Sequence, residues 1–112
     1  MGLVAKQNRF ALCLGLLYLE IERRGMVYTL GDCYRSPEVF GGIGERKGYG
    51  HPSSCHKYRL AQDINLFDAD GGLIDDNKYH KELHAWWVVN CCGAPMIPHD
   101  SNHYSFAHNG CI

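Results

Sequence analysis

The sequence has little net charge and no segment of biased composition. Eleven lysines and arginines stand against twelve acidic residues, a formal charge of −1. This balance predicts neither a basic surface for nucleic acid nor a polybasic patch for a membrane. No internal repeat or low-complexity tract is visible, and hydrophobic residues make up 46% of the 112 positions. We therefore expect one folded domain over residues 1–112.

The sequence also lacks an apolar run long enough to cross a bilayer. Its longest run, "FALCLGLLYL", passes directly into the charged "EIERRG". That run is too short for a spanning helix, and no small-residue cleavage site follows it, as a signal peptide would require. We interpret it as a core helix and expect synthesis in the cytoplasm without an export signal.

Cysteine is plentiful, but its spacing does not favour a disulfide framework. None of the six cysteines forms a CxxC pair, and Cys91 and Cys92 are adjacent. This pattern favours mostly free thiols and a reducing compartment, with a secreted disulfide scaffold as the alternative.

Hydrophobic periodicity predicts a mixed α+β domain. Helices are expected over 5–24, just after Ser36, and over 77–92, and strands over 26–31, 60–67 and 103–106. A glycine-rich loop occupies 41–53, and "DADGG" predicts a hairpin turn into a return strand at "LI". The order of elements indicates a small antiparallel sheet packed on helices.

Two amphipathic patterns predict which residues form the core. In the first helix these are Phe10, Cys13, Leu14, Leu16, Leu17 and Ile21, and in the last they are Leu83, Trp86, Trp87 and Val88.

One aspartate stands out inside the strand predicted over 60–67. Strand alternation places Leu60, Ile64 and Leu66 on one face and Asp63 on the other. A carboxylate on a sheet face has to be solvated, paired or bound to a metal. A simply solvated face is one explanation, and a metal site is the other.

Three further residues favour the metal site. His56 precedes the strand in irregular chain, and Asp100 and His103 stand three apart at the last strand. His56, Asp63 and His103 supply two imidazoles and one carboxylate, the ligand set of a catalytic zinc site with an open fourth position. Asp100 is then placed to act as the general base.

These motifs resemble those of a known peptidase family. "S-x-H-(6)-D", followed by "D-x-x-H", is similar to the pattern of the zinc D-Ala-D-Ala carboxypeptidases and L-alanyl-D-glutamate peptidases. That family includes phage endolysins and vancomycin-resistance dipeptidases, and the Hedgehog signalling domain shares its fold. The phage branch is the most similar over nearly the whole chain, because "TLG", "YRSPE" and "AQDINLF" follow its order.

The resemblance implies a fold, a cofactor and a set of roles. It implies a Hedgehog-like α+β fold with one zinc ion held by His56, Asp63 and His103, and Asp100 as base. Arg35 would bind substrate and stabilise the oxyanion, and Ser54 would line the site. The implied activity is cleavage of the L-alanyl–D-glutamate bond of peptidoglycan, acting on the cell wall after release by a holin-type partner. The alternatives are a D-Ala-D-Ala carboxypeptidase or dipeptidase, and a zinc-binding module without catalysis.

Two positions depart from the family pattern. Arg59 stands where the family has glycine, and "CCGAPMIP" over 91–98 replaces a "W-G-G-x-F"-like segment. The first departure affects the ligand loop, and the second affects the wall of the substrate cleft.

Other candidate sites have simpler explanations. "HKELH" places His80 and His84 on one helical face, which we interpret as solvent-exposed. "DADGGLIDD" lacks the full ligand pattern of a calcium loop, so calcium is only a weak prediction. His51 and His99 are interpreted as loop residues near the site, with substrate contact for the first and orientation of Asp100 for the second as alternatives.

Overall fold

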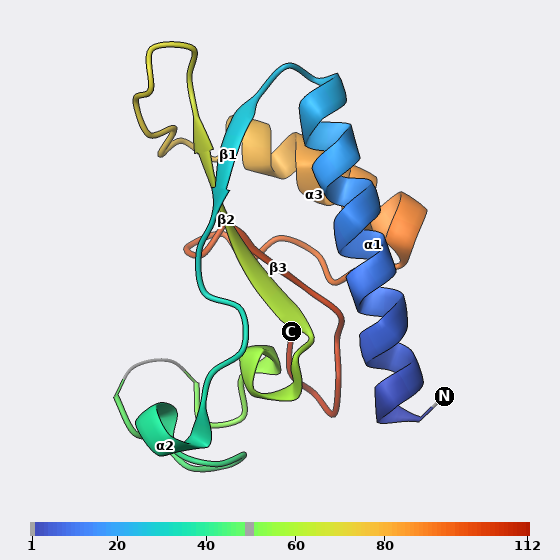
Figure 1. Cartoon of the computed structure of the whole chain (residues 1–112), viewed down its shortest axis with the longest axis vertical. Helices are drawn as coiled ribbons and strands as arrows, with labels where there is room; N and C mark the ends of the chain where they lie inside the picture. Colours follow the sequence, from blue (N-terminus) through green and yellow to red (C-terminus); the bar gives the residue numbers. More distant parts are fainter. Residues whose placement is uncertain (1, 49–50) are drawn as a thin grey trace.

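A three-stranded antiparallel sheet with β2 at its centre organises the molecule (Figure 1). The computed structural model describes residues 2–48 and 51–112. The elements in chain order are α1 (Leu3–Arg23), β1 (Val27–Leu30), α2 (Pro37–Phe40), the 3-10 helix η1 (Cys55–Tyr58), β2 (Ala61–Phe67), α3 (Lys78–Cys91) and β3 (His103–Ser105). The predicted α+β class with a small antiparallel sheet is confirmed.

The two long helices lie on the same side of the sheet and bury its apolar face (Figure 1). The core is formed by Phe10, Cys13, Leu17, Ile21, Cys55, Leu60, Ala61, Ile64, Leu66, Leu83, Trp87, Cys91, Tyr104 and Phe106. Phe10 contacts Trp87 and Phe106 edge-on, with ring centroids 5.9 and 5.2 Å apart. Such T-shaped contacts add to the stabilisation that burial already supplies.

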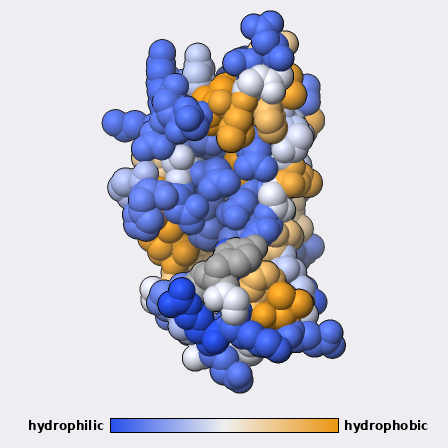
Figure 2. All heavy atoms as spheres, turned by 90° about the vertical axis from the view of Figure 1, so that its left-hand side faces the viewer, coloured by the Kyte–Doolittle hydropathy of each residue, from blue (hydrophilic) through white to orange (hydrophobic). Residues whose placement is uncertain are grey.

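Strand β2 has the alternation that the sequence predicts. Leu60, Ile64 and Leu66 are fully buried, whereas Asp63 and Asn65 are only half-buried on the opposite face. On the side of the molecule away from α1, hydrophilic residues cover most of the surface and apolar residues form separate patches (Figure 2).

Two core predictions were wrong because each residue lies at the margin of the buried face of its helix. Leu16 is 44% exposed and Val88 is 41% exposed. In α1 the buried face runs through Cys13, Leu17 and Ile21, which leaves Leu16 at its margin. In α3 the buried residues are His80, Leu83, His84, Trp87 and Cys91.

The orientation of α3 also overturns the prediction for "HKELH". His80 and His84 are each only 3% exposed, so they belong to the buried face and not to a solvated one. The spacing 80, 83, 84, 87 is that of a core-facing stripe. The histidines occupy two of its positions because each finds a hydrogen-bond partner in the chain that it covers.

The predicted hairpin forms its turn but not its return strand. Only a single bridge joins Phe67 to Leu73. The chain then turns away, because the Asp76 carboxylate accepts from Lys78 N at 2.9 Å and starts α3. In the turn, Asp68 Oδ1 accepts from the backbone nitrogens of Asp70 and Gly72, each at 2.9 Å.

The short helix α2 begins as predicted. Ser36 is its N-cap and accepts from Glu38 N, and Pro37 holds the first helical position. Of the glycine-rich loop that follows, residues 49 and 50 lie outside the described ranges. None of the helices in the described ranges combines the length and apolar character needed to cross a membrane.

Candidate metal centre

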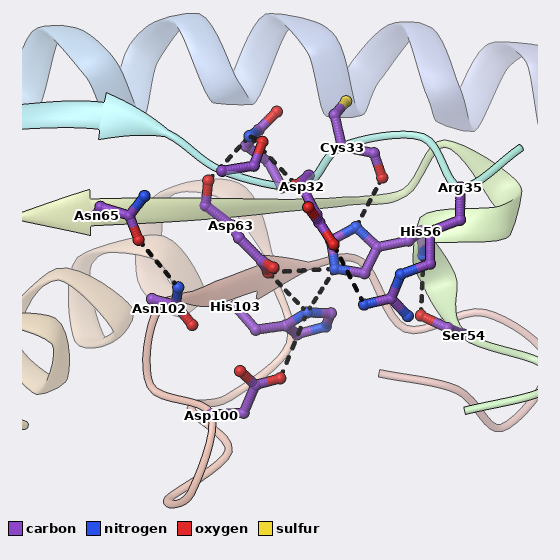
Figure 3. A network of polar contacts seen from close by, with 12 residues as sticks. Asp32, Cys33, Arg35, Ser54, His56, Asp63, Asn65, Asp100, Asn102 and His103 are labelled. Atoms are coloured by element: carbon purple, nitrogen blue, oxygen red, sulfur yellow. Dashed lines mark hydrogen bonds and ion pairs between the residues drawn. The ribbon is translucent and has the colours of Figure 1, made fainter. Parts of the chain in front are cut away.

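Three side chains from different parts of the chain converge at one end of the sheet (Figure 3). Asp63 lies in β2 directly opposite His103 in β3, where the two residues form a registered pair. His56 comes from η1, which precedes β2. Ser54 caps this short helix, since its Oγ accepts from His56 N at 3.3 Å. The sheet register and the η1 turn therefore bring all three side chains together.

The three ligand atoms form a nearly equilateral triangle. His56 Nε2 lies 3.2 Å from Asp63 Oδ1 and 3.2 Å from His103 Nδ1. His103 Nδ1 lies 3.4 Å from Asp63 Oδ1. A tetrahedral zinc site with bonds of about 2.0–2.1 Å places neighbouring ligand atoms roughly 3.3 Å apart. The triangle therefore has the size that one small metal ion requires.

The hydrogen bond that His56 makes through its other ring nitrogen also fits a bound cation. His56 Nδ1 lies 2.7 Å from the carbonyl oxygen of Cys33, which can only accept, so this nitrogen carries the proton. In the neutral ring Nε2 then directs a lone pair at the Asp63 carboxylate, which is also an acceptor. Only a cation or a shared proton at the centre makes that contact favourable. Orientation of a ligand histidine by a carbonyl is typical of protein metal sites.

The electrostatics keep Asp63 ionised. Burial raises the pKa of the Asp63 carboxyl, but when the facing imidazole nitrogens carry protons, hydrogen bonds and charge attraction from His103 and His56 outweigh this effect and lower it to about 2. An anionic oxygen beside two imidazoles is a suitable donor set for a divalent transition metal. His56, Asp63 and His103 can thus hold a metal ion.

No second group of this kind is present among the described residues. His56, Asp63 and His103 are the one group there of three or more histidine, cysteine or acidic ligands close enough to share an ion. The weakly predicted calcium loop gains no support, because the Asp68 carboxylate is engaged with backbone nitrogens of its own turn.

Asp100 lies on the open side of the centre. Its Oδ2 is 3.9 Å from His103 Nδ1, and its side chain is 47% exposed. Backbone bonds set the turn that carries it, since Asp100 N donates to Ile97 O and His103 N donates to Asp100 O. An exposed carboxylate at this distance can exchange a proton with a small molecule beside the three ligands.

Arg35 and Ser54 line the same cavity. This cavity measures about 460 Å³ and is lined by Arg35, His51, Ser54, His56, Ile97, His99, Asp100, His103, Gly110, Cys111 and Ile112. The Arg35 backbone nitrogen donates to His56 O at 3.3 Å, and its guanidinium lies 3.9 Å from Asp32. Five of the six predicted site residues therefore line one opening, and the sixth, Asp63, contacts two of them, His56 and His103. His51 and His99 line the opening without belonging to the described ligand group.

The two departures from the family pattern leave the triangle intact. Arg59 adopts a left-handed conformation, with φ of 58° and ψ of 36°, at the end of η1. Glycine takes this conformation without strain, whereas other residues do so at a cost. The Arg59 guanidinium carbon lies 3.9 Å from the centroid of the Tyr34 ring, an attraction that offsets part of that cost. From the altered segment 91–98, Ile97 supplies part of the cavity wall.

A buried lysine next to His56 anchors the first part of the glycine-rich loop. Lys57 is 8% exposed, and its ammonium donates to the carbonyl oxygens of Phe40, Gly42 and Glu45. Three carbonyl acceptors compensate a cation that burial would otherwise penalise. The loop is thereby tied to the turn of chain that carries His56.

Sequence reasoning missed two supports of the site. The Cys33 carbonyl is a backbone group, so no residue type signals it. His84 is predicted to be exposed, although its place in the stripe 80, 83, 84, 87 indicates burial.

Comparison with protein-family models, curated proteins and solved structures finds no significant match to this chain.

Proposed function

We propose that this chain is a zinc metallopeptidase that cleaves the stem peptides of bacterial peptidoglycan. The observation that supports it most is the triangle of His56 Nε2, Asp63 Oδ1 and His103 Nδ1, with sides of 3.2, 3.2 and 3.4 Å. Three protein ligands beside an open cavity are typical of catalytic zinc sites, whereas structural sites use four. The "S-x-H-(6)-D" and "D-x-x-H" motifs favour the L-alanyl–D-glutamate endopeptidases of phage or prophage endolysins.

The proposal gives each residue a role that its position supports. His56, Asp63 and His103 would hold zinc, which when bound acts as a Lewis acid and lowers the pKa of its water to about 7. Asp100 would accept a proton from the attacking water and return it to the leaving amine. Arg35 would donate to the developing oxyanion across the cavity, a role that suits its fixed positive charge. Such an enzyme would reach the wall with help from a holin-type partner.

Product analysis tests the proposal. Purified peptidoglycan is incubated with the zinc-loaded protein, and new termini are identified. A free D-glutamate amine supports the endopeptidase, whereas released D-alanine supports a carboxypeptidase. No new terminus of either kind, from protein that holds zinc, supports a binding module and rejects the catalytic proposal.

A matched pair of variants tests the role of Asp100. Asp100→Asn keeps the size of the side chain but removes the base, so the rate should fall about 10²–10⁴-fold with zinc still bound. His99→Ala, at the neighbouring exposed position of the same cavity, should retain activity. Activity of Asp100→Asn equal to the parent would reject the mechanism.

A further inference from the structure

Helix α3 presents three polar groups to the segment that carries Asp100 and His103. His80, His84 and Trp87 lie on one buried face of the helix. His80 Nδ1 lies 2.8 Å from the Tyr104 hydroxyl, His84 Nε2 lies 2.7 Å from Ser101 O, and Trp87 Nε1 donates to Ser105 O at 2.9 Å. The contacts of His80 and Trp87 hold β3 against α3, and the contact of His84 holds the turn that precedes β3.

The contact of His84 has a defined direction. Ser101 O can only accept, so His84 Nε2 must carry the proton and donate. Burial lowers the pKa of His84 to about 4, so the ring is neutral near pH 7. In this tautomer Nδ1 is a buried lone pair that has no partner among the described residues. The ring is thus committed to a single hydrogen bond.

Packing holds the His84 ring in place for that bond. The ring stacks on Tyr104, with centroids 4.0 Å apart and planes 6° from parallel. Tyr104 is fully buried and follows His103 in β3. Because side chains alternate along a strand, Tyr104 points into the core while His103 points to the ligand triangle. The stack therefore joins His84 to the strand that carries His103.

Ser101 lies between the two functional residues of the turn. The turn is exposed at Asp100 and is closed by the backbone bond from His103 N to Asp100 O at 3.1 Å. The Ser101 carbonyl is the point where this exposed turn is tied to a buried helix. A shift there would move Asp100 and His103 together relative to His56 and Asp63.

We infer that His84 is a positioning residue of the metal centre, which holds the Ser101 carbonyl and so fixes the turn that presents Asp100 and His103. This inference rests on the proposed metal-binding function of that centre. Partners outside the ligand group that orient it typically change metal affinity about 10–100-fold when they are lost. His80 bonds the Tyr104 hydroxyl and not the turn, so its loss leaves the Ser101 contact in place.

A pair of amides at position 84 separates positioning from packing. Glutamine carries its amide nitrogen near the place of Nε2 and can still donate to Ser101 O, whereas the shorter asparagine cannot reach it. Cobalt(II), whose visible absorption reports coordination geometry, is titrated into metal-free parent, His84→Gln and His84→Asn. We expect His84→Asn to bind cobalt about 10–100-fold more weakly with an altered spectrum, and His84→Gln to bind within about threefold of the parent.

His80→Asn is the matched control for lost stability. It removes a histidine of equal burial from the same helix face but leaves the Ser101 contact intact. It should lower the free energy of unfolding while cobalt affinity and spectrum stay those of the parent. Equal loss of affinity in both asparagine variants, or none in His84→Asn, would overturn the positioning role.

The outcomes distinguish this inference from the proposed function. If the parent binds neither cobalt nor zinc, the proposed function and the positioning role both fail. If the parent binds metal and His84→Asn binds it with the same affinity and spectrum, only the positioning role fails. Should His84→Asn not fold, nitrogen NMR of the parent supplies the test. The inference then requires the proton on His84 Nε2 and slower exchange of that proton once zinc is bound, and a proton on Nδ1 rejects it.

Discussion

The Nδ1 atom of His56 lies 2.7 Å from the carbonyl oxygen of Cys33, and this contact decides which ring nitrogen faces Asp63. The chain after β1 runs beside β2, where Gly31 N donates to Asp63 O and Asp63 N donates to Asp32 O, each at 2.8 Å. This pairing places the Cys33 carbonyl oxygen beside the His56 ring. The ring nitrogen of His56 that faces Asp63 is thus set by backbone geometry.

Metal uptake should therefore release protons. At the triangle an ion replaces whatever proton is shared among His56, Asp63 and His103, so affinity for zinc should fall as the pH is lowered. Calorimetric titration in buffers of different ionisation enthalpy measures the number released. His56→Ala should abolish binding, and His99→Ala should leave it unchanged. Zinc affinity that is independent of pH between 5 and 8 would contradict the assignment.

Acid should destabilise the protein through the two buried histidines of α3. Burial lowers the pKa of both His80 and His84 from 6.5 to about 4. The unfolded chain therefore binds protons that the folded chain does not, so stability is complete above pH 6.5 and falls as the pH drops toward 4. Each histidine corresponds to about 3 kcal/mol over that range.

Urea unfolding of the metal-free protein at several pH values measures this loss. His84→Gln should reduce the dependence on pH between 6.5 and 4 by about half, because one of the two groups no longer titrates. If the free energy of unfolding of His84→Gln depends on pH as strongly as that of the parent, His84 is not buried in its neutral form.

Gly93 should not tolerate a side chain. A Cβ atom there would meet Trp87 Nε1 at 1.9 Å and Cδ1 at 2.1 Å, within the fully buried contact of Trp87 with the core. Gly93→Ala should lower the free energy of unfolding by about 3 kcal/mol or more. Gly15→Ala is the control, since nothing lies within 4 Å of its Cβ and it stands in the exposed middle of α1. It should raise stability by about 0.5–1 kcal/mol.

Arg59 should be replaceable by glycine without loss of the metal centre. Glycine would relieve the left-handed strain, about 1 kcal/mol, and give up the contact with Tyr34, about 0.5–1 kcal/mol. Arg59→Gly should thus change stability by less than about 1 kcal/mol, whereas Arg59→Ala keeps the strain and should be less stable than Arg59→Gly by about 1 kcal/mol. Urea unfolding with zinc titration checks both. Weakened zinc binding in Arg59→Gly would show that the guanidinium supports the ligands.

Lys57 should be required for an ordered glycine-rich loop. Lys57→Met removes the donor to three carbonyl oxygens and should cost about 2–4 kcal/mol, with faster proteolysis within 41–48. Lys47→Met is the control, because Lys47 is exposed and its ammonium donates to one carbonyl, that of Glu38. Equal effects of the two changes would contradict a special role for Lys57.

The sequence predicted those features that depend on local periodicity and on one strand. Alternation alone placed Asp63 on the face opposite Leu60, Ile64 and Leu66, and the structure confirms it. The helix predicted over 5–24 ends at Arg23, and Gly25, with φ of 73°, adopts the left-handed conformation that commonly follows a helix end.

Features that depend on the partner of a side chain could not be read from periodicity. The sequence predicts His80 and His84 as exposed, but each imidazole is buried because it finds a hydrogen-bond partner. Those partners, Tyr104 and Ser101, lie about twenty residues away. The predicted return strand at Leu73 does not form for a similar reason: the residues that follow Leu73 lead into α3, where the Asp76 carboxylate accepts from Lys78 N.

The pairing of Asp63 with His103 across β2 and β3 makes the centre sensitive to strand register. Side chains repeat every two residues along a strand, so a slip of β3 by one position would turn His103 toward the core and Tyr104 toward solvent. A bound ion would then lose a ligand, while the correct register keeps all three. Strand β3 has only three residues to specify its alignment. A bound ion at this position would therefore stabilise the correct register over a shifted one, because only the correct register supplies all three ligands.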